Sequence, residues 1–115
     1  PDHRNTALLV WAAVQKLSSD GMAVNVYSYE IGVQNPVNIF IDITAQRPRK
    51  EQAMTIYASQ NDENNYEELV LSLDKGRTFT LPAEVSHAEG FYLYSKEELA
   101  TSLKEVTHNI IELYF

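Results

Sequence analysis

Three polar groups in the sequence have residue types and spacings that could support chemistry. The first is Glu105, His108 and Glu112, which fall at i, i+3 and i+7 of an expected helix. Glu-x-x-His supplies metal ligands in di-iron carboxylate bundles, but those sites need the motif twice together with further carboxylates. Within the expected helices the motif occurs once. We therefore expect a solvated helix face rather than a metal site.

The second group is His87 with Glu84 and Glu89, in an expected loop over residues 83–90. A histidine beside carboxylates can act as a general base. No serine or cysteine nucleophile motif accompanies it, and the adjacency of Ser86 carries little weight because catalytic triads assemble in space. We therefore expect a surface loop and no catalytic residue.

The third group is Asp62, Glu63 and Asn64, whose oxygen atoms could ligate a hard cation. An EF-hand loop needs glycine at its sixth position, and counting from Asn61 or Asp62 places none there. The 4 glycines are isolated, so no phosphate-binding loop is present. The sequence therefore predicts neither a metal nor a cofactor.

Tyrosines give a different signal, that of a protein interface. The tyrosines that carry this signal lie on expected strands, and two pairs of them recur at spacing two: Tyr27, Tyr29, Tyr57, Tyr92 and Tyr94. Tyrosine is enriched at interfaces because it combines a large contact area with a hydroxyl group. We expect these rings, joined by Phe40, to line the sheet face turned away from the helices. Ordinary cross-strand pairing without a function is the alternative.

The net charge of −7 lies entirely in residues 58–115, because the charges of residues 1–57 balance. Such a surface repels nucleic acid and anionic membranes and attracts a basic protein. The alternative is that the charge only keeps the chain soluble. A small basic cluster at Arg47, Arg49 and Lys50 could touch an anionic partner. The predicted partner-binding residues are Tyr27, Tyr29, Tyr57, Asp62, Glu63, Glu67, Glu68, Tyr92 and Tyr94.

Two helices are expected at the ends of the sequence. The first spans residues 6–19 and ends at Asp20-Gly21, where glycine suits a left-handed C-terminal cap. The second runs from Ser95 to Phe115, with Ser95 and Glu98 forming a capping box. Its apolar residues recur at spacings of four and three and form one stripe: Leu99, Leu103, Val106, Ile110 and Leu113.

Strands are expected between these helices. Period-two alternation predicts them at residues 22–31, 37–44, 66–73, 77–81 and 91–94, with 37–44 inside the sheet. Residues 52–58 fit either element: Pro48 favours a helix, whereas alternation favours a strand, and we predict a strand. Loops are expected at 59–65 and 83–90, and Asp74-Lys75-Gly76 is expected to form a hairpin turn.

These elements predict a single α+β domain over residues 1–115. We expect a two-layer sandwich, in which an antiparallel five- or six-stranded sheet carries both terminal helices on one face. The sequence has no cysteine, which excludes disulfides and fits a reducing compartment. No apolar run approaches the ~20 residues that span a membrane, so we expect a cytoplasmic protein.

Size and acidity are similar to those of small bacterial inhibitors, such as immunity proteins that neutralise a basic toxin. The leading hypothesis is therefore a non-enzymatic, acidic inhibitor of this type, present as a monomer or homodimer. One alternative is a dimer resembling type III secretion chaperones, which would bind an effector segment. Another is a small-molecule-binding protein or small enzyme that uses His87, Glu84 or Asp42. No motif links the chain to any of these families.

Overall fold

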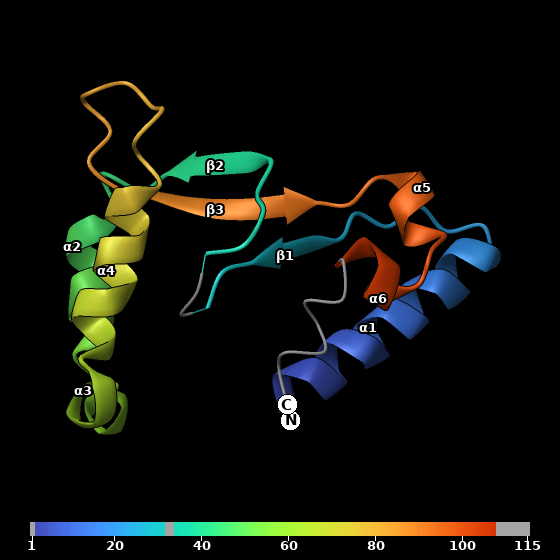
Figure 1. Ribbon diagram of the computed structural model, residues 1–115, viewed down its shortest axis with the longest axis horizontal. Coiled ribbons are helices and arrows are strands. Elements are labelled where there is room, and N and C mark those ends of the chain that lie inside the picture. The colour runs from blue at the N-terminus through green and yellow to red at the C-terminus, as the bar shows by residue number, and fades with distance from the viewer. Residues whose placement is uncertain (1, 32–33, 108–115) are drawn as a thin grey trace. The chain divides into compact units, whose positions relative to one another are not determined.

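The computed structural model describes residues 2–31 and 34–107, which belong to two compact units (Figure 1). Unit 1 consists of Pro1–Val26 with Tyr94–Phe115, and unit 2 is Tyr27–Leu93. Within the described residues, no helix has the length and apolar character needed to cross a membrane. The expectation of a single domain stays a prediction.

Unit 1 contains helices α1 (Asp2–Ser19), α5 (Lys96–Leu99) and α6 (Leu103–Val106). Its core is a cluster of four buried apolar side chains, Trp11, Val14, Leu99 and Leu103. Leu99 and Leu103 of the apolar stripe predicted for the C-terminal segment therefore pack against α1. Ile110 and Leu113 of that stripe lie outside the described residues.

The first helix is less buried than its composition suggests. Trp11 and Val14 are buried, but Leu8, Leu9 and Val10 are exposed. After the helix, Gly21 adopts a positive φ of 84°, which confirms the predicted glycine cap.

The expected continuous helix from Ser95 is wrong for the described residues, because it breaks between Leu99 and Leu103. The Ser95–Glu98 capping box is confirmed, and Ser102 and Glu105 form a second one. In a continuous helix, the Thr101 carbonyl would accept from the Glu105 N–H. Here it accepts from Trp11 Nε1 at 2.9 Å and from Gln15 Nε2 at 2.9 Å. Two donors on α1 therefore stabilise the break.

Unit 2 holds a three-stranded antiparallel sheet with the order β1-β3-β2, formed by β1 (Tyr27–Tyr29), β2 (Ile39–Asp42) and β3 (Ala88–Leu93). The predicted sheet of five or six strands is therefore wrong, as is the two-layer sandwich built on it. β2 confirms the centre of the strand expected at 37–44, but it is an edge strand rather than an interior one. The central strand is β3, half of which was expected to be loop.

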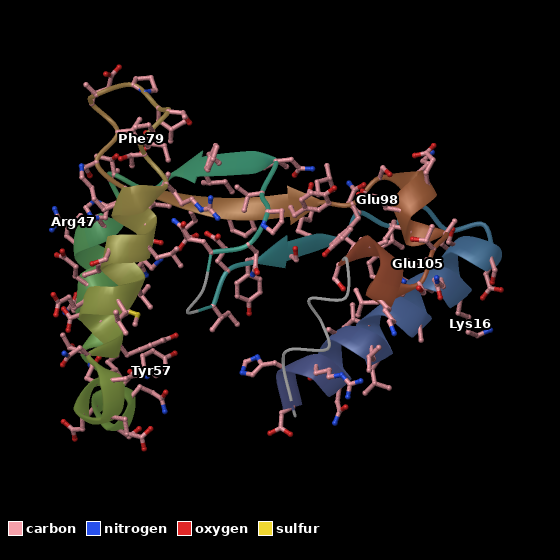
Figure 2. All side chains as sticks on the ribbon, viewed as in Figure 1. Lys16, Arg47, Tyr57, Phe79, Glu98 and Glu105 are labelled. Carbon is pink, nitrogen blue, oxygen red and sulfur yellow. The ribbon has the colours of Figure 1, made fainter. Side chains whose placement is uncertain are left out.

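Three helices occupy the chain between β2 and β3: α2 (Arg47–Met54), α3 (Ala58–Asn64) and α4 (Tyr66–Gly76). α4 packs against α2, α3 and β3 (Figure 1). These helices replace the strands predicted at 52–58 and 66–73, the loop at 59–65 and the hairpin turn at 74–76. The segment predicted as a strand at 77–81 forms turns, and Phe79 on it is 95% exposed (Figure 2).

Leucine spacing explains the error over residues 66–73. Leu69, Leu71 and Leu73 alternate, which predicted a strand with all three side chains inward. Leucine is nevertheless a strong helix former, whereas strands favour β-branched side chains. Glu67 and Glu68 in the first turn of α4 and Lys75 in its last turn also complement the helix dipole. Leu69 is consequently 55% exposed instead of inward.

Candidate partner-binding surface

Four predicted partner-binding carboxylates gather where α3 meets α4: Asp62, Glu63, Glu67 and Glu68, called here the acidic corner. Asp62, Glu63 and Glu68 are exposed, and Glu67 is half-buried. None of the four forms an ion pair with a described residue. The negative charges of the corner are therefore open to a partner.

Two asparagines position this corner. Asn65 turns α3 into α4 in the left-handed conformation, at φ 54° and ψ 43°, which asparagine tolerates better than most residues. Asn61 Nδ2 donates to the Met54 carbonyl at 3.1 Å, and Asn61 Oδ1 accepts from the Glu67 N–H at 2.8 Å. The second bond satisfies a backbone donor in the first turn of α4, so the corner has a defined backbone.

An aromatic pair links the start of α3 to the start of α4, next to the corner. Tyr57, labelled in Figure 2, is 55% exposed, and Ile56 just before it in the sequence is 79% exposed. The Tyr57 and Tyr66 rings meet edge to face with their centroids 6.4 Å apart. Tyr57 thus lies next to a helix rather than on a strand, yet it does neighbour the acidic residues with which it was grouped.

The other tyrosines do not form one face. Tyr27 and Tyr29 share a sheet face with Phe91, which pairs with both Tyr29 and Ile39. Tyr92 points to the opposite face, because neighbouring strand residues alternate. Phe40, which pairs with Gly90, is on that second face too. Tyr94 follows β3 in unit 1, where its ring meets Trp11 edge to face at 5.1 Å.

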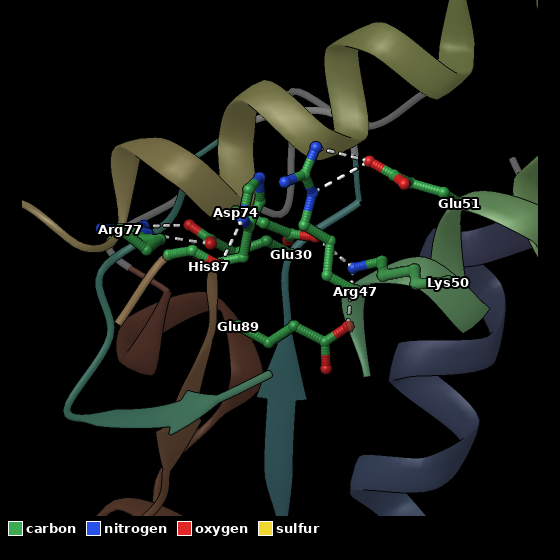
Figure 3. Close-up of polar contacts among 9 residues, drawn as sticks. Glu30, Arg47, Lys50, Glu51, Asp74, Arg77, His87 and Glu89 are labelled. Carbon is green, nitrogen blue, oxygen red and sulfur yellow. Dashed lines mark hydrogen bonds and ion pairs between the residues drawn. The ribbon is translucent and has the colours of Figure 1, made fainter. Parts of the chain in front are cut away.

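The basic cluster is used within unit 2. Lys50 Nζ lies 2.5 Å from Asp74 Oδ2 and 2.6 Å from Glu89 Oε1, which joins α2, α4 and β3 (Figure 3). Burial, together with the nearby charge of Glu89, raises the pKa of Asp74 above its usual value, although Lys50 acts in the opposite direction. Arg47 Nη2 lies 2.7 Å from Glu51. Two of the three cluster charges are therefore paired, which weakens the expectation of an anionic partner.

A second ion pair fixes the far end of α4. Arg77 Nε donates to Glu30 at 2.9 Å, its Nη2 also bonds Glu30, and Nη2 donates to the Asn35 carbonyl at 2.7 Å (Figure 3). The pair lies against Gly90, where an added Cβ would come within 3.0 Å of Glu30 and 2.9 Å of Val37. Glycine at this position of β3 therefore leaves room for the ion pair.

An open hollow of about 560 Å³ runs along α4 and includes Glu67, Glu68, Lys75 and His87 in its lining. His87 is only 7% exposed, so the expected surface loop is wrong at this residue. Burial lowers the pKa of His87, and the charges of Arg47 and Lys75 lower it further. The strand that follows His87 begins with the small residues Ala88 and Gly90, which are both buried but gave no apolar alternation in the sequence.

The remaining candidates stay apart from this hollow. Glu84 is exposed on the turn before β3 and does not line it. The exposed Asp42 carboxylate accepts from the Thr44 N–H at 2.8 Å, and hydrogen bonding to Thr44 lowers its pKa. No group of histidine and acidic side chains in the described part of the chain could hold a metal ion. His108 and Glu112 lie outside that part.

No protein family, curated protein or solved structure matches this chain.

Proposed function

We propose that the chain is a non-enzymatic protein-binding module, an acidic inhibitor of the immunity type that neutralises a basic protein partner. The observation that carries this proposal is the acidic corner, whose four carboxylates have no ion pair among the described residues. Other charged groups of unit 2 contrast with it, since Lys50 and Arg77 are paired with acids of their own unit. A partner can therefore supply the cations that the corner lacks.

The neighbouring aromatic pair supports the same function. Charged groups at an interface mainly steer association, whereas buried aromatic and apolar anchors supply most of the affinity. Exposed Tyr57, whose ring meets that of Tyr66 at the start of α4, offers such an anchor beside the corner. A cytoplasmic location, a monomeric or homodimeric state, and the absence of nucleic-acid and membrane partners complete the proposal.

The test starts from capture of binding proteins by the full chain from a lysate of the organism that encodes it. We expect a basic protein, whose association rate with the purified chain falls steeply as salt increases. The double variant Asp62→Asn/Glu63→Gln should slow association about tenfold at low salt. The matched control, Glu84→Gln/Glu97→Gln, removes the same charge elsewhere and should have a much smaller effect.

Two results would contradict the proposal. One is an association rate that does not depend on salt. The other is an equal effect of the corner variant and its control, because the corner would then act only through net charge.

A small-molecule-binding protein is the second candidate, and the hollow along α4 is the observation that favours it. The hollow brings His87 together with carboxylate, amide and ammonium groups, as ligand sites do. Glu84 and Asp42, the other residues expected to serve such a site, are not part of its lining.

A further inference from the structure

Strand β2 is an edge strand whose outer side is open. It pairs with β3, and within the described residues no strand lies on its other side (Figure 1). Ile43 N–H donates to the His87 carbonyl at 3.0 Å. Because hydrogen-bonded and non-hydrogen-bonded pairs alternate along an antiparallel ladder, Ile41 also turns its backbone groups toward β3, whereas those of Phe40 and Asp42 point away. A further strand can bind these outward groups.

The side chains of β2 do not protect this edge. Natural edge strands commonly carry lysine or proline, which discourage pairing with another chain. β2 has the sequence Ile-Phe-Ile-Asp and contains neither. Phe40 is 39% exposed and Ile41 is 49% exposed. An apolar edge of this kind favours pairing with another strand.

The sequence around Phe40 indicates which strand that is. The five residues centred on Phe40 read Asn-Ile-Phe-Ile-Asp, so their chemical types follow the same order in both directions. Two copies placed antiparallel about a two-fold axis at Phe40 bring the two phenylalanines together. Each Ile39 then faces Ile41 of the other copy. Each Asn38 faces Asp42, so no like charges meet, and the segment is complementary to itself, as a two-fold interface requires.

The polar residues at the two ends of this segment already have partners in their own chain. Asn38 Nδ2 donates to the Leu93 carbonyl at 3.0 Å, and Asn38 Oδ1 accepts from the Leu93 N–H at 2.8 Å. The Asp42 carboxylate accepts from the Thr44 N–H at 2.8 Å. A second copy therefore has to supply apolar contacts and backbone groups, but no new partner for these side chains.

We propose that β2 pairs antiparallel with β2 of a second copy, centred on Phe40, so that the two three-stranded sheets join into one continuous sheet. The backbone N–H and carbonyl of Phe40 bond those of Phe40 in the other copy. The two phenylalanine rings meet on one face of the sheet and the isoleucines meet on the other. This inference goes beyond the proposed function, and it selects the homodimer over the monomer.

Other symmetric registers of the same strand fit less well. A shift that places Asp42 opposite its own counterpart brings two carboxylates together, and like charges directly opposite each other destabilise a sheet. A smaller shift places Asp42 opposite Phe40 and removes water from a carboxylate without providing a new hydrogen bond. The register centred on Phe40 avoids both costs.

The first experiment is sedimentation velocity of the full chain from about 10 μM to about 1 mM. We expect a reversible dimer with a dissociation constant on the order of 100 μM, because the contact is smaller than the ~1,200–2,000 Å² of stable interfaces. Higher salt should strengthen the dimer, since both copies carry a net charge of −7 and salt screens their repulsion. The proposed function predicts the opposite salt dependence for a basic partner, so each of the two proposals can fail without the other.

A matched pair of variants tests the position of the contact. Phe40→Asp places two like charges opposite each other on the axis and should weaken the dimer at least about tenfold. Phe79→Asp adds the same charge at a residue that is 95% exposed and lies outside β2, so the dissociation constant should change less than about twofold. Far-UV circular dichroism checks that both variants keep the fold.

Cysteine cross-linking tests the register without removing Phe40. The sequence has no cysteine, so Ile39→Cys mixed with a mass-tagged Ile41→Cys forms disulfides only at the chosen positions. Directly opposite residues have Cα atoms about 4.5–5.5 Å apart, within the range of a disulfide, whereas diagonal neighbours are about 7–8 Å apart. Mild oxidation should therefore give at least about fivefold more of the mixed disulfide than of either homodimeric one.

Four outcomes would overturn the inference. The first three are a chain that stays monomeric at the highest concentration, equal weakening by Phe79→Asp, and homodimeric disulfides as abundant as the mixed one. The fourth is growth beyond the dimer, which would indicate that β2 pairs with β1 of another copy. That contact is not two-fold symmetric and leaves a free edge at each end.

Discussion

Each of the two units of this chain is stabilised internally by a different kind of interaction. Unit 1 buries four apolar side chains in one contiguous cluster. Among the described residues of unit 2, the buried side chains are those of the apolar Ile43, Met54 and Ala88 and the polar Asp74 and His87, and Gly90 is buried as well. Directed ion pairs at Lys50 and Arg77 connect the helices of unit 2 to its strands.

The difference indicates where binding is to be sought. An apolar core tolerates changes that conserve volume and places few constraints on the surface charges around it. Where ion pairs hold a unit together, each buried charge needs a partner of opposite sign. Carboxylates of the same unit that have no such partner are therefore candidates for binding another protein. The acidic corner lies in unit 2 and takes no part in these ion pairs. Each of the following predictions tests this contrast, from the largest expected effect to the smallest.

Trp11→Ala should have the largest effect, a loss of about 4 kcal/mol in the free energy of unfolding, because it empties the centre of the apolar cluster. The substitution also removes the hydrogen bond that Trp11 Nε1 donates to the Thr101 carbonyl. Denaturant unfolding measures the change, and hydrogen exchange should show weaker protection in α1, α5 and α6 than in β3. Trp11→Phe keeps an apolar ring and should cost less. A loss under about 1 kcal/mol for Trp11→Ala would contradict the role given to this cluster.

Lys50→Met should cost about 3 kcal/mol, because the Asp74 side chain, 6% exposed, would lose its cation. The double variant Lys50→Met/Asp74→Leu should cost less than Lys50→Met, since it removes the stranded carboxyl as well. Urea unfolding of the three proteins measures this. Arg47→Met is the control and should cost under about 1 kcal/mol, because its ion pair is more exposed. A larger loss in the double variant would show that the stranded Asp74 carboxyl is not the cause of the loss in Lys50→Met.

The smallest effect should appear in the pH dependence of stability. Because burial lowers the pKa of His87, the unfolded chain takes up a proton at this residue more readily than the folded chain. Stability should therefore fall as pH decreases from about 6.5 toward the lowered pKa, and this part of the slope should be absent in His87→Gln. The measurement is the free energy of unfolding of the original chain and of His87→Gln across that pH range. NMR titration of the His87 ring in the folded chain complements it. An unchanged slope in His87→Gln would exclude the buried neutral histidine.

Local signals in the sequence predicted local features correctly. The Ser95–Glu98 capping box, the left-handed Gly21 and the centre of β2 each depend on residues close together in the chain. The grouping of acids as a partner-binding set also came from the sequence. Their gathering at one corner did not, because on the expected strand Glu67 and Glu68 would point to opposite faces.

Features that depend on distant contacts were missed. β3 contains Ala88 and Gly90, whose small side chains gave no alternating apolar pattern. Their positions make sense only with β2 alongside and with the Glu30–Arg77 pair over Gly90. The break at Thr101 likewise depends on donors from α1, about 90 residues earlier. Such contacts override local propensity, which is a weak determinant by itself.

The placement of β3 has a consequence for synthesis on the ribosome. Within the described residues, β1 and β2 each pair with β3 and not with each other. A nascent chain that has reached Gly76 already contains α1 to α4, but neither strand yet has its partner. α1 also waits for Leu99 and Leu103 to complete its core. Neither core can therefore close before the segment from β3 to Leu103 has been synthesised, and until then Tyr29 and Ile39 lack their common neighbour, Phe91.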